Sequence, residues 1–196
     1  VGDPGKKAKN AFDFLDQTVS KKFSKDFNFK DDGDFRYWTP IETESIKPPR
    51  GSCLLISKGD QTLAQYNEAA KLLKLEFIAK VIDGERLIWY ASHVPENEEG
   101  HCNNLHDGIY GEISHGGCQL RVGGDSTHIP DSPRMDKGKH KHRIQIKNDT
   151  LLWKIDGRTV IKHPLPPKLA NRKGKFGVGG NHSIIEFRRI SVVGEK

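Results

Sequence analysis

Side chains that could do chemistry are concentrated between residues 86 and 128 of this 196-residue chain. Glu112 stands alone on a short apolar and aromatic run, His115 follows three residues later, and Arg121 lies on the next predicted strand. A carboxylate or imidazole can remove a proton, and a cation can stabilise the negative charge that develops. We therefore predict Glu112, His115 and Arg121 as candidate catalytic residues.

The predicted strands place further polar and aromatic residues around this group. Residues 109–115 and 118–122 predict a β-hairpin that turns at Gly116 and Gly117. Because successive strand residues face opposite sides, Tyr110 and Glu112 should share one face. The predicted substrate-binding residues are Trp89, His93, Tyr110 and Gln119. The alternative interpretation is a solvated face with an ordinary cross-strand ion pair between Glu112 and Arg121.

Histidines cluster in the same part of the chain. Five of the nine histidines lie between His93 and His128. Imidazole and carboxylate oxygen are ligands that divalent metal ions accept, so His106 and Asp107 are candidate metal ligands. No cofactor other than a possible divalent metal ion is indicated. Zinc is disfavoured because the sequence has no Cys-x-x-Cys pair.

Hydrolysis by a pair of carboxylates needs the two acids at a defined separation. Glu112 has no second acid on its predicted strand, so a two-carboxylate mechanism would recruit Asp107 or Asp125 from loops. One base and one electrophile are enough for a different route, in which a proton beside a carbonyl is removed and a leaving group is then eliminated. Both routes remain open at this point.

The elements that must position these residues are mostly strands. Apolar and polar residues alternate in 142–147 and 151–155, with Asn148-Asp149 and Asp156-Gly157 as turn signals, and 184–193 predicts a closing strand with apolar residues on both faces. The last of these strands should be central in its sheet. Leu72 to Ile82 and Arg86 to His93 predict a hairpin at Asp83-Gly84. Residues 61–73 predict a loop or helical turn, and 123–139 a long connection.

The C-terminal third supports a resemblance. Its order of a basic strand, Leu-Trp-Lys-Ile-Asp-Gly, Thr-Val-Ile, Gly-Lys-Phe-Gly-Val-Gly-Gly and Ile-Glu-Phe-Arg-Arg-Ile-Ser-Val resembles concanavalin A/laminin-G-like jelly-roll domains. Within that superfamily it is most similar to bacterial extracytoplasmic domains of the 3-keto-disaccharide hydrolase family. The resemblance implies a carbohydrate ligand on the concave sheet, and no catalytic motif of the family was matched.

The strand count and turn spacing predict an all-β fold. We expect a two-sheet antiparallel jelly-roll sandwich, concanavalin A-like, of about a dozen strands with one or two short helices. Residues 1–196 are expected to form a single domain. Cys102 and Cys118 could pair, with Cys53 as a small core residue, and the sequence leaves that pairing open.

Composition narrows the class of partner. The net charge is +6, but the 32 Lys and Arg residues are interspersed with 26 acids. That pattern favours a solvated surface over nucleic-acid binding. No apolar run reaches the roughly 20 residues that cross a bilayer. We expect a monomer located outside the cytoplasm, from which a signal segment has been removed.

Together these observations predict a carbohydrate-active protein, a hydrolase or lyase that acts on a glycoside or a 3-keto-glycoside. A non-catalytic glycan-binding module is the first alternative. A polyanion-binding protein, suggested only by the net charge, is the second.

Overall fold

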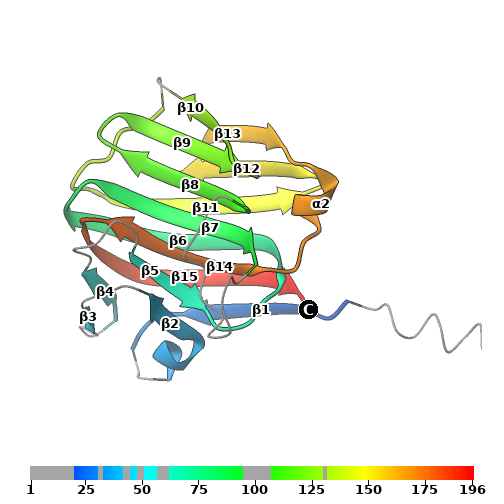
Figure 1. Ribbon diagram of the computed structural model, residues 1–196. Helices are drawn as coiled ribbons and strands as arrows, with labels where there is room; N and C mark the ends of the chain where they lie inside the picture. The colour runs from blue at the N-terminus through cyan, green and yellow to red at the C-terminus, as the bar shows by residue number, and fades with distance from the viewer. Residues whose placement is uncertain are drawn as a thin grey trace, which may run out of the picture.

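The computed structural model describes residues 20–30, 33–41, 45–47, 51–56, 62–94, 107–129 and 132–196. They form two antiparallel β-sheets that face each other, one with eight strands and one with seven (Figure 1). Helical structure in these residues is limited to a 3-10 turn, η1 (Asp34–Tyr37), and one short α-helix, α2 (Pro167–Ala170). The predicted all-β sandwich is confirmed. No helix in the described part of the chain is both long and apolar enough to span a membrane.

The eight-stranded sheet contains most of the C-terminal third of the chain. β15 lies inside this sheet, paired with β6 on one side and with β4 and β1 on the other, so its predicted central place is confirmed. The strands in spatial order are β13 (Arg158–Pro164), β12 (Thr150–Ile155), β11 (Lys139–Lys147), β6 (Lys71–Asp83), β15 (Ile184–Glu195), β4 (Cys53–Ile56) and β3 (Ser45–Lys47), with β1 (Lys22–Phe27) also on β15.

The seven-stranded sheet carries the candidate site residues. The predicted hairpin in this sheet is confirmed, because β8 and β9 pair with Ser114 opposite Gly117. The strands in spatial order are β10 (Asp125–Ile129), β9 (Gly117–Val122), β8 (Ile109–Ser114), β7 (Arg86–His93), β14 (Lys175–Asn181), β5 (Thr62–Tyr66) and β2 (Trp38–Ile41).

The hydrophobic core lies between the two sheets. Alternation buries one face of each strand, as in β12, where Leu151, Trp153 and Ile155 are buried and the residues between them are half-buried. Trp153 meets Trp89 from the opposite sheet edge to face, with ring centroids 5.4 Å apart. Such a pair contributes about 0.5 to 1.5 kcal/mol beyond the burial of its area.

The expected hairpin of residues 72–82 and 86–93 is wrong. β6 belongs to the eight-stranded sheet and β7 to the seven-stranded sheet, so the turn between them crosses from one sheet to the other. At this corner Gly84 has a φ of +119°, and a Cβ there would lie 2.3 Å from the carbonyl oxygen of His182. The Asp83-Gly84 turn signal was real, but a local signal does not say which sheet the next strand enters.

Two other expectations need correction. Residues 61–73 were predicted as a loop or helical turn, yet β5 occupies Thr62–Tyr66, with Ala64 and Tyr66 buried in the core. The connection 123–139 contains β10, whose residues Asp125 to His128 are all exposed. An edge strand with no buried face has no hydrophobic alternation, so the sequence pattern could not reveal it.

Candidate functional site

Two rows of side chains cross the outer face of the seven-stranded sheet, the face turned away from the other sheet. In β8, Ile109 and Ile113 face the core, so Tyr110 and Glu112 face outward. Strand register then fixes their neighbours across the sheet. One row contains Gln65, Gly177, Tyr90, Tyr110, Arg121 and Ser126, and the next contains Gly179, Ile88, Glu112, Gln119 and His128.

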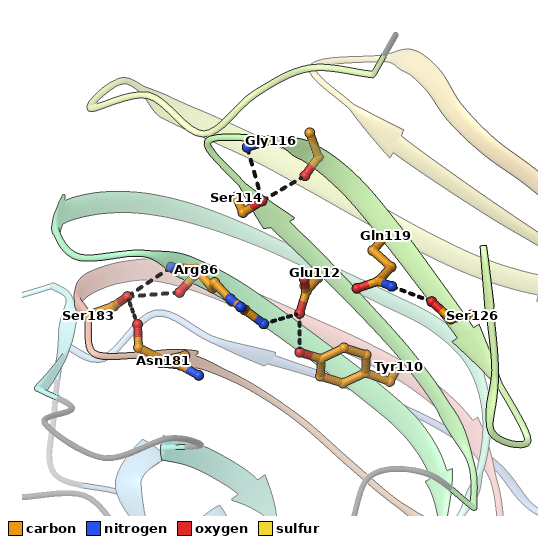
Figure 2. Close-up of polar contacts among 10 residues, drawn as sticks. Arg86, Tyr110, Glu112, Ser114, Gly116, Gln119, Ser126, Asn181 and Ser183 are labelled. Atoms are coloured by element: carbon orange, nitrogen blue, oxygen red, sulfur yellow. Dashed lines mark hydrogen bonds and ion pairs between the residues drawn. The ribbon is translucent and has the colours of Figure 1, made fainter. Parts of the chain in front are cut away.

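Glu112 is the centre of a small polar network on this face. Tyr110 donates its hydroxyl proton to Oε2 of Glu112 at 2.5 Å, and Nη1 of Arg86 lies 3.3 Å from the same oxygen (Figure 2). Both contacts fall on Oε2, which leaves Oε1 as the oxygen that can interact with a ligand. Burial and the neighbouring Glu112 charge raise the pKa of Tyr110 far above its usual value, so the phenol remains a donor at neutral pH.

The ion pair expected between Glu112 and Arg121 is made by Arg86 instead. Arg86 begins β7 and reaches across to the neighbouring strand β8, where its side chain is 40% exposed and that of Glu112 only 7%. Arg121 lies in the other row, with its guanidinium carbon 5.9 Å from the centre of the Tyr110 ring. Arg121 therefore stays close to the network, as a cation beside the phenol.

Exposure of the outward side chains increases steadily across the sheet. Ile88 and Tyr90 of β7 are fully buried, and Glu112 of β8 is 6% exposed. Gln119 of β9 is half-buried, and His128 of β10 is exposed. The side-chain amide of Gln119 donates to the hydroxyl of Ser126. Glu112 thus lies at the boundary between a buried apolar half of the face and an open polar half, and a ligand would approach from the side of β9 and β10.

The buried half contains an apolar cluster of Ile41, Ile88, Tyr90 and Tyr110. The ring of Tyr90 lies over Gly177, where a Cβ would come within 2.7 Å of the ring, and its hydroxyl donates to Oε1 of Gln65 at 3.3 Å. The bare backbone of β14 is what allows this ring to reach from β7 to β5. Sequence reasoning missed this cluster because its members come from distant strands.

His93 lies on the same outer face as Tyr90, next to a second polar cluster. Its buried ring meets the Tyr90 ring edge to face at 5.4 Å, and its Nδ1 lies 2.7 Å from Oδ1 of Asp107. Arg172 lies 3.0 Å from the other oxygen of Asp107 and also donates to the Ser92 carbonyl. Both oxygens of Asp107, a candidate metal ligand, therefore lie next to protein groups.

The other candidate metal ligand, His106, lies outside the described residues. Within the described ranges no group of three or more His, Cys, Asp or Glu side chains is placed to hold a metal ion. Cys102 also lies outside the described residues, while Cys118 is a buried free thiol that contacts the carbonyl oxygen of Pro133. The pairing left open between these two cysteines is not made.

Two predicted site residues are not part of the network. Trp89 is fully buried in the core against Trp153 and lies beneath Gly111, whose Cβ would meet its ring at 2.3 Å. It therefore faces the wrong side of the sheet to bind a ligand beside Glu112. His115 is exposed in the turn between β8 and β9. Of the predicted residues, the outer face brings together Tyr110, Glu112, Gln119, Arg121 and His93.

The fold is shared with proteins of solved structure. A protein of unknown function with a galectin-like fold from Bacillus subtilis matches with a TM-score of 0.65 at 10% identity, covering 91% of this chain and 100% of that one. A carbohydrate binding module of Bacillus subtilis gives a TM-score of 0.58 at 11% identity, with coverages of 80% and 95%. A β-glucanase of Bacillus licheniformis gives 0.59 at 10% identity, with coverages of 89% and 99%.

These similarities establish a galectin-like, concanavalin A-like jelly-roll fold. At such low identity they carry no residue roles. No family model and no curated protein matches the chain.

Proposed function

We propose that this chain is a carbohydrate-active protein whose ligand lies on the open half of the outer face, against Glu112, Gln119 and Arg121. The observation that carries the proposal is the near-complete burial of the Glu112 carboxylate, with Oε2 held by two donors at the edge of an open polar surface. A buried carboxylate in an ion pair rarely improves stability over an apolar residue of similar size, which favours a functional reason for it.

The groups on this half suit a sugar. Sugar hydroxyls are recognised by planar polar side chains such as amides, carboxylates and guanidinium groups. Gln119, Arg121 and Arg86 provide such groups around Glu112 and are themselves half-buried or partly exposed. Solved structures with the same fold include a carbohydrate binding module and a β-glucanase, which agrees with a glycan ligand.

We further propose that the protein is a hydrolase or lyase that acts on a glycoside, with a 3-keto-glycoside as the substrate that best fits a lone carboxylate. Oε1 of Glu112 would take the proton from C2, beside the C3 ketone, and Arg121 would stabilise the enolate. The enolate electrons would then expel the C1 substituent, which leaves with a proton, and water added to the resulting double bond would complete a hydrolysis. An extracytoplasmic location belongs to the same proposal.

A non-catalytic glycan-binding module is the second candidate. It is favoured by one observation, that none of the outward residues that the strand register places next to Glu112 on β7, β8 and β9 is an Asp or Glu. A conventional two-carboxylate glycosidase would need one within about 5 to 10 Å.

The experiment that separates the candidates is a panel of glycosides and their 3-keto derivatives, each assayed for turnover and for binding. Release of the aglycone from a 3-keto-glycoside alone is the result expected of the elimination. Binding without turnover would identify the module, and absence of both would refute the carbohydrate proposal. Repeating the panel with and without added divalent cation tests the metal requirement that the sequence suggested.

A further inference from the structure

The outer face of the eight-stranded sheet, opposite the site proposed above, carries a second feature. Two adjoining open depressions of about 550 Å³ and about 470 Å³ share the residues Gln145, Lys147 and Asn148. They lie where β6, β11, β12 and β13 run side by side (Figure 1). We call this surface the lysine groove. The charged residues that line it are Lys22, Lys71, Lys74, Lys147, Lys162, Asp149 and Glu195.

The charges along the groove do not balance. Glu195 lies 3.5 Å from Lys71 and 3.9 Å from Lys22, so it accounts for those two lysines. Lys74, Lys147 and Lys162 make no ion pair within the described part of the chain, although the charge of Lys74 helps to lower the pKa values of Glu76 and Asp26. Asp149 is the second acid among the described lining residues, so five lysines face two carboxylates and the groove keeps a net positive charge.

Some other cations on the same face are paired. Lys141 and Arg143 both contact the carboxylate of Glu76, at 2.6 Å and 3.5 Å. Arg189 contacts Asp26 at 3.4 Å. Lys80, Lys139 and Lys154 make no ion pair among the described residues either, so what distinguishes the groove is the combination of unpaired lysines with a depression.

Strand register fixes the spacing of the three unpaired lysines. Lys74 lies opposite Gln145, Gln145 opposite Leu152, and Leu152 opposite Lys162. Lys74 and Lys162 are therefore three strands apart, about 14 Å, while Lys147 lies two residues along β11 from Gln145, about 7 Å. The lysines surround a floor that is partly aliphatic and partly amide.

The floor chemistry points to a type of anion. Leu73, Leu152 and Val193 are half-buried and offer apolar surface to the C–H faces of a sugar ring, while Gln145 and Asn148 offer amides to its hydroxyl groups. None of the described residues that line the two depressions is aromatic, so these residues offer no platform for stacking nucleic-acid bases. We propose that the lysine groove binds an acidic polysaccharide, with carboxylate or sulfate groups at the three unpaired lysines.

Two triple variants test the proposal. K74Q/K147Q/K162Q removes the three unpaired lysines, and K80Q/K139Q/R158Q removes three exposed cations from the opposite end of the same sheet, with the same change in net charge. Both are titrated, beside the parent protein, with fluorescent sulfated and uronic-acid oligosaccharides, neutral dextran, duplex DNA and anionic phospholipid vesicles.

The expected result is binding of an acidic oligosaccharide but not of dextran, weakened about tenfold or more in the groove variant and less than about threefold in the control. The salt dependence of the binding constant should fall in slope by about 2 in the groove variant, because three ionic contacts are lost. Glu112→Gln should leave this binding unchanged, which keeps the test independent of the proposal for the other sheet.

Three outcomes would overturn the proposal. Absence of acidic oligosaccharide binding at low salt would refute the proposal. Equal weakening of that binding in both triple variants would show that it depends only on net charge. Tighter binding of DNA or vesicles than of any acidic oligosaccharide, with the same dependence on the three lysines, would assign the groove to that other partner instead.

Discussion

Glu112→Gln tests the site on the seven-stranded sheet most directly, because glutamine keeps the shape of the side chain and removes its charge. If Oε1 accepts the substrate proton, the loss of that proton transfer should lower turnover about a hundredfold or more on any glycoside that the panel identifies as a substrate. Ligand affinity should change much less, because Gln119, Arg121 and Arg86 remain in place around the ligand.

The stability cost of this change can be worked out from two contacts. The amide of glutamine still accepts the Tyr110 proton, but a neutral acceptor is weaker than a charged one by roughly 1 kcal/mol. The ion pair with Arg86, whose side chain is 40% exposed, contributes less than about 1 kcal/mol to stability. We expect a total loss of about 1 to 2 kcal/mol, which lowers Tm by about 3 to 6 °C in a chain of this size.

Glu76→Gln is the matched control. Glu76 also has a mostly buried carboxylate, 20% exposed, with two cationic partners, but it lies on the outer face of the other sheet. Thermal melts and steady-state kinetics on both variants separate function from folding. A loss of turnover confined to Glu112→Gln supports the assignment. Full turnover in Glu112→Gln would refute it and make His115, with the loop acids, the next candidate for the base.

The remaining predictions concern three other residues. Tyr110→Phe removes the hydroxyl donor to Glu112 and should cost about 1 to 2 kcal/mol in chemical denaturation, whereas an unchanged midpoint would mean that the bond contributes nothing. Gly177→Ala places a Cβ 2.4 Å from the Ala64 carbonyl oxygen and 2.7 Å from the Tyr90 ring and should destabilise by about 1 to 3 kcal/mol; a neutral melt would show that both the β5 backbone and the ring can move. Burial, with the charge of His140, lowers the pKa of His142 to about 3, so the unfolded chain binds the extra proton and stability falls as pH falls from about 6.5 towards 3. Between about pH 7.5 and 4.5 the His142→Phe variant should therefore lose about 2 to 3 kcal/mol less free energy of unfolding than the parent protein. An equal loss in parent and variant would contradict the assigned burial effect.

The alternation of residues along the predicted strands was enough to place side chains on the face around Glu112. It was not enough to predict that Arg86 pairs with Glu112. Tyr110, Glu112, Gln119 and Arg121 were placed correctly on one face because they belong to a single tight hairpin, β8 and β9, where strand parity holds. Arg86 was missed because β7 was assigned to a hairpin with β6. Its true neighbour β8 comes after a separation of more than a dozen residues that carries no pairing signal.

The prediction that Trp89, like His93, faces a ligand was wrong for a local reason. Strict alternation puts Trp89 and His93 on the same side of β7, since they are four residues apart. Ser92 has a φ of +60°, and the pairing of β7 with β14 shifts register there, so the strand side reverses between Ala91 and His93. Trp89 consequently faces the core while His93 faces outward. A bulge at a serine leaves no recognisable mark in a single sequence.

The place of Glu112 on the sheet follows from small residues on neighbouring strands. Gly177 of β14 lets the Tyr90 ring lie flat over the backbone, and Tyr90 in turn packs with Ile88 and Tyr110 into a cluster without exposed surface. Glu112 is adjacent to that cluster in the strand register and so is largely shielded from water, whereas Gln119 on its other side is half-exposed. A carboxylate shielded on one side and reachable on the other interacts more strongly with a cation or hydrogen-bond donor than one in bulk water, because each electrostatic interaction there is less screened. The apolar half of the face therefore contributes to the proposed chemistry without contacting the ligand.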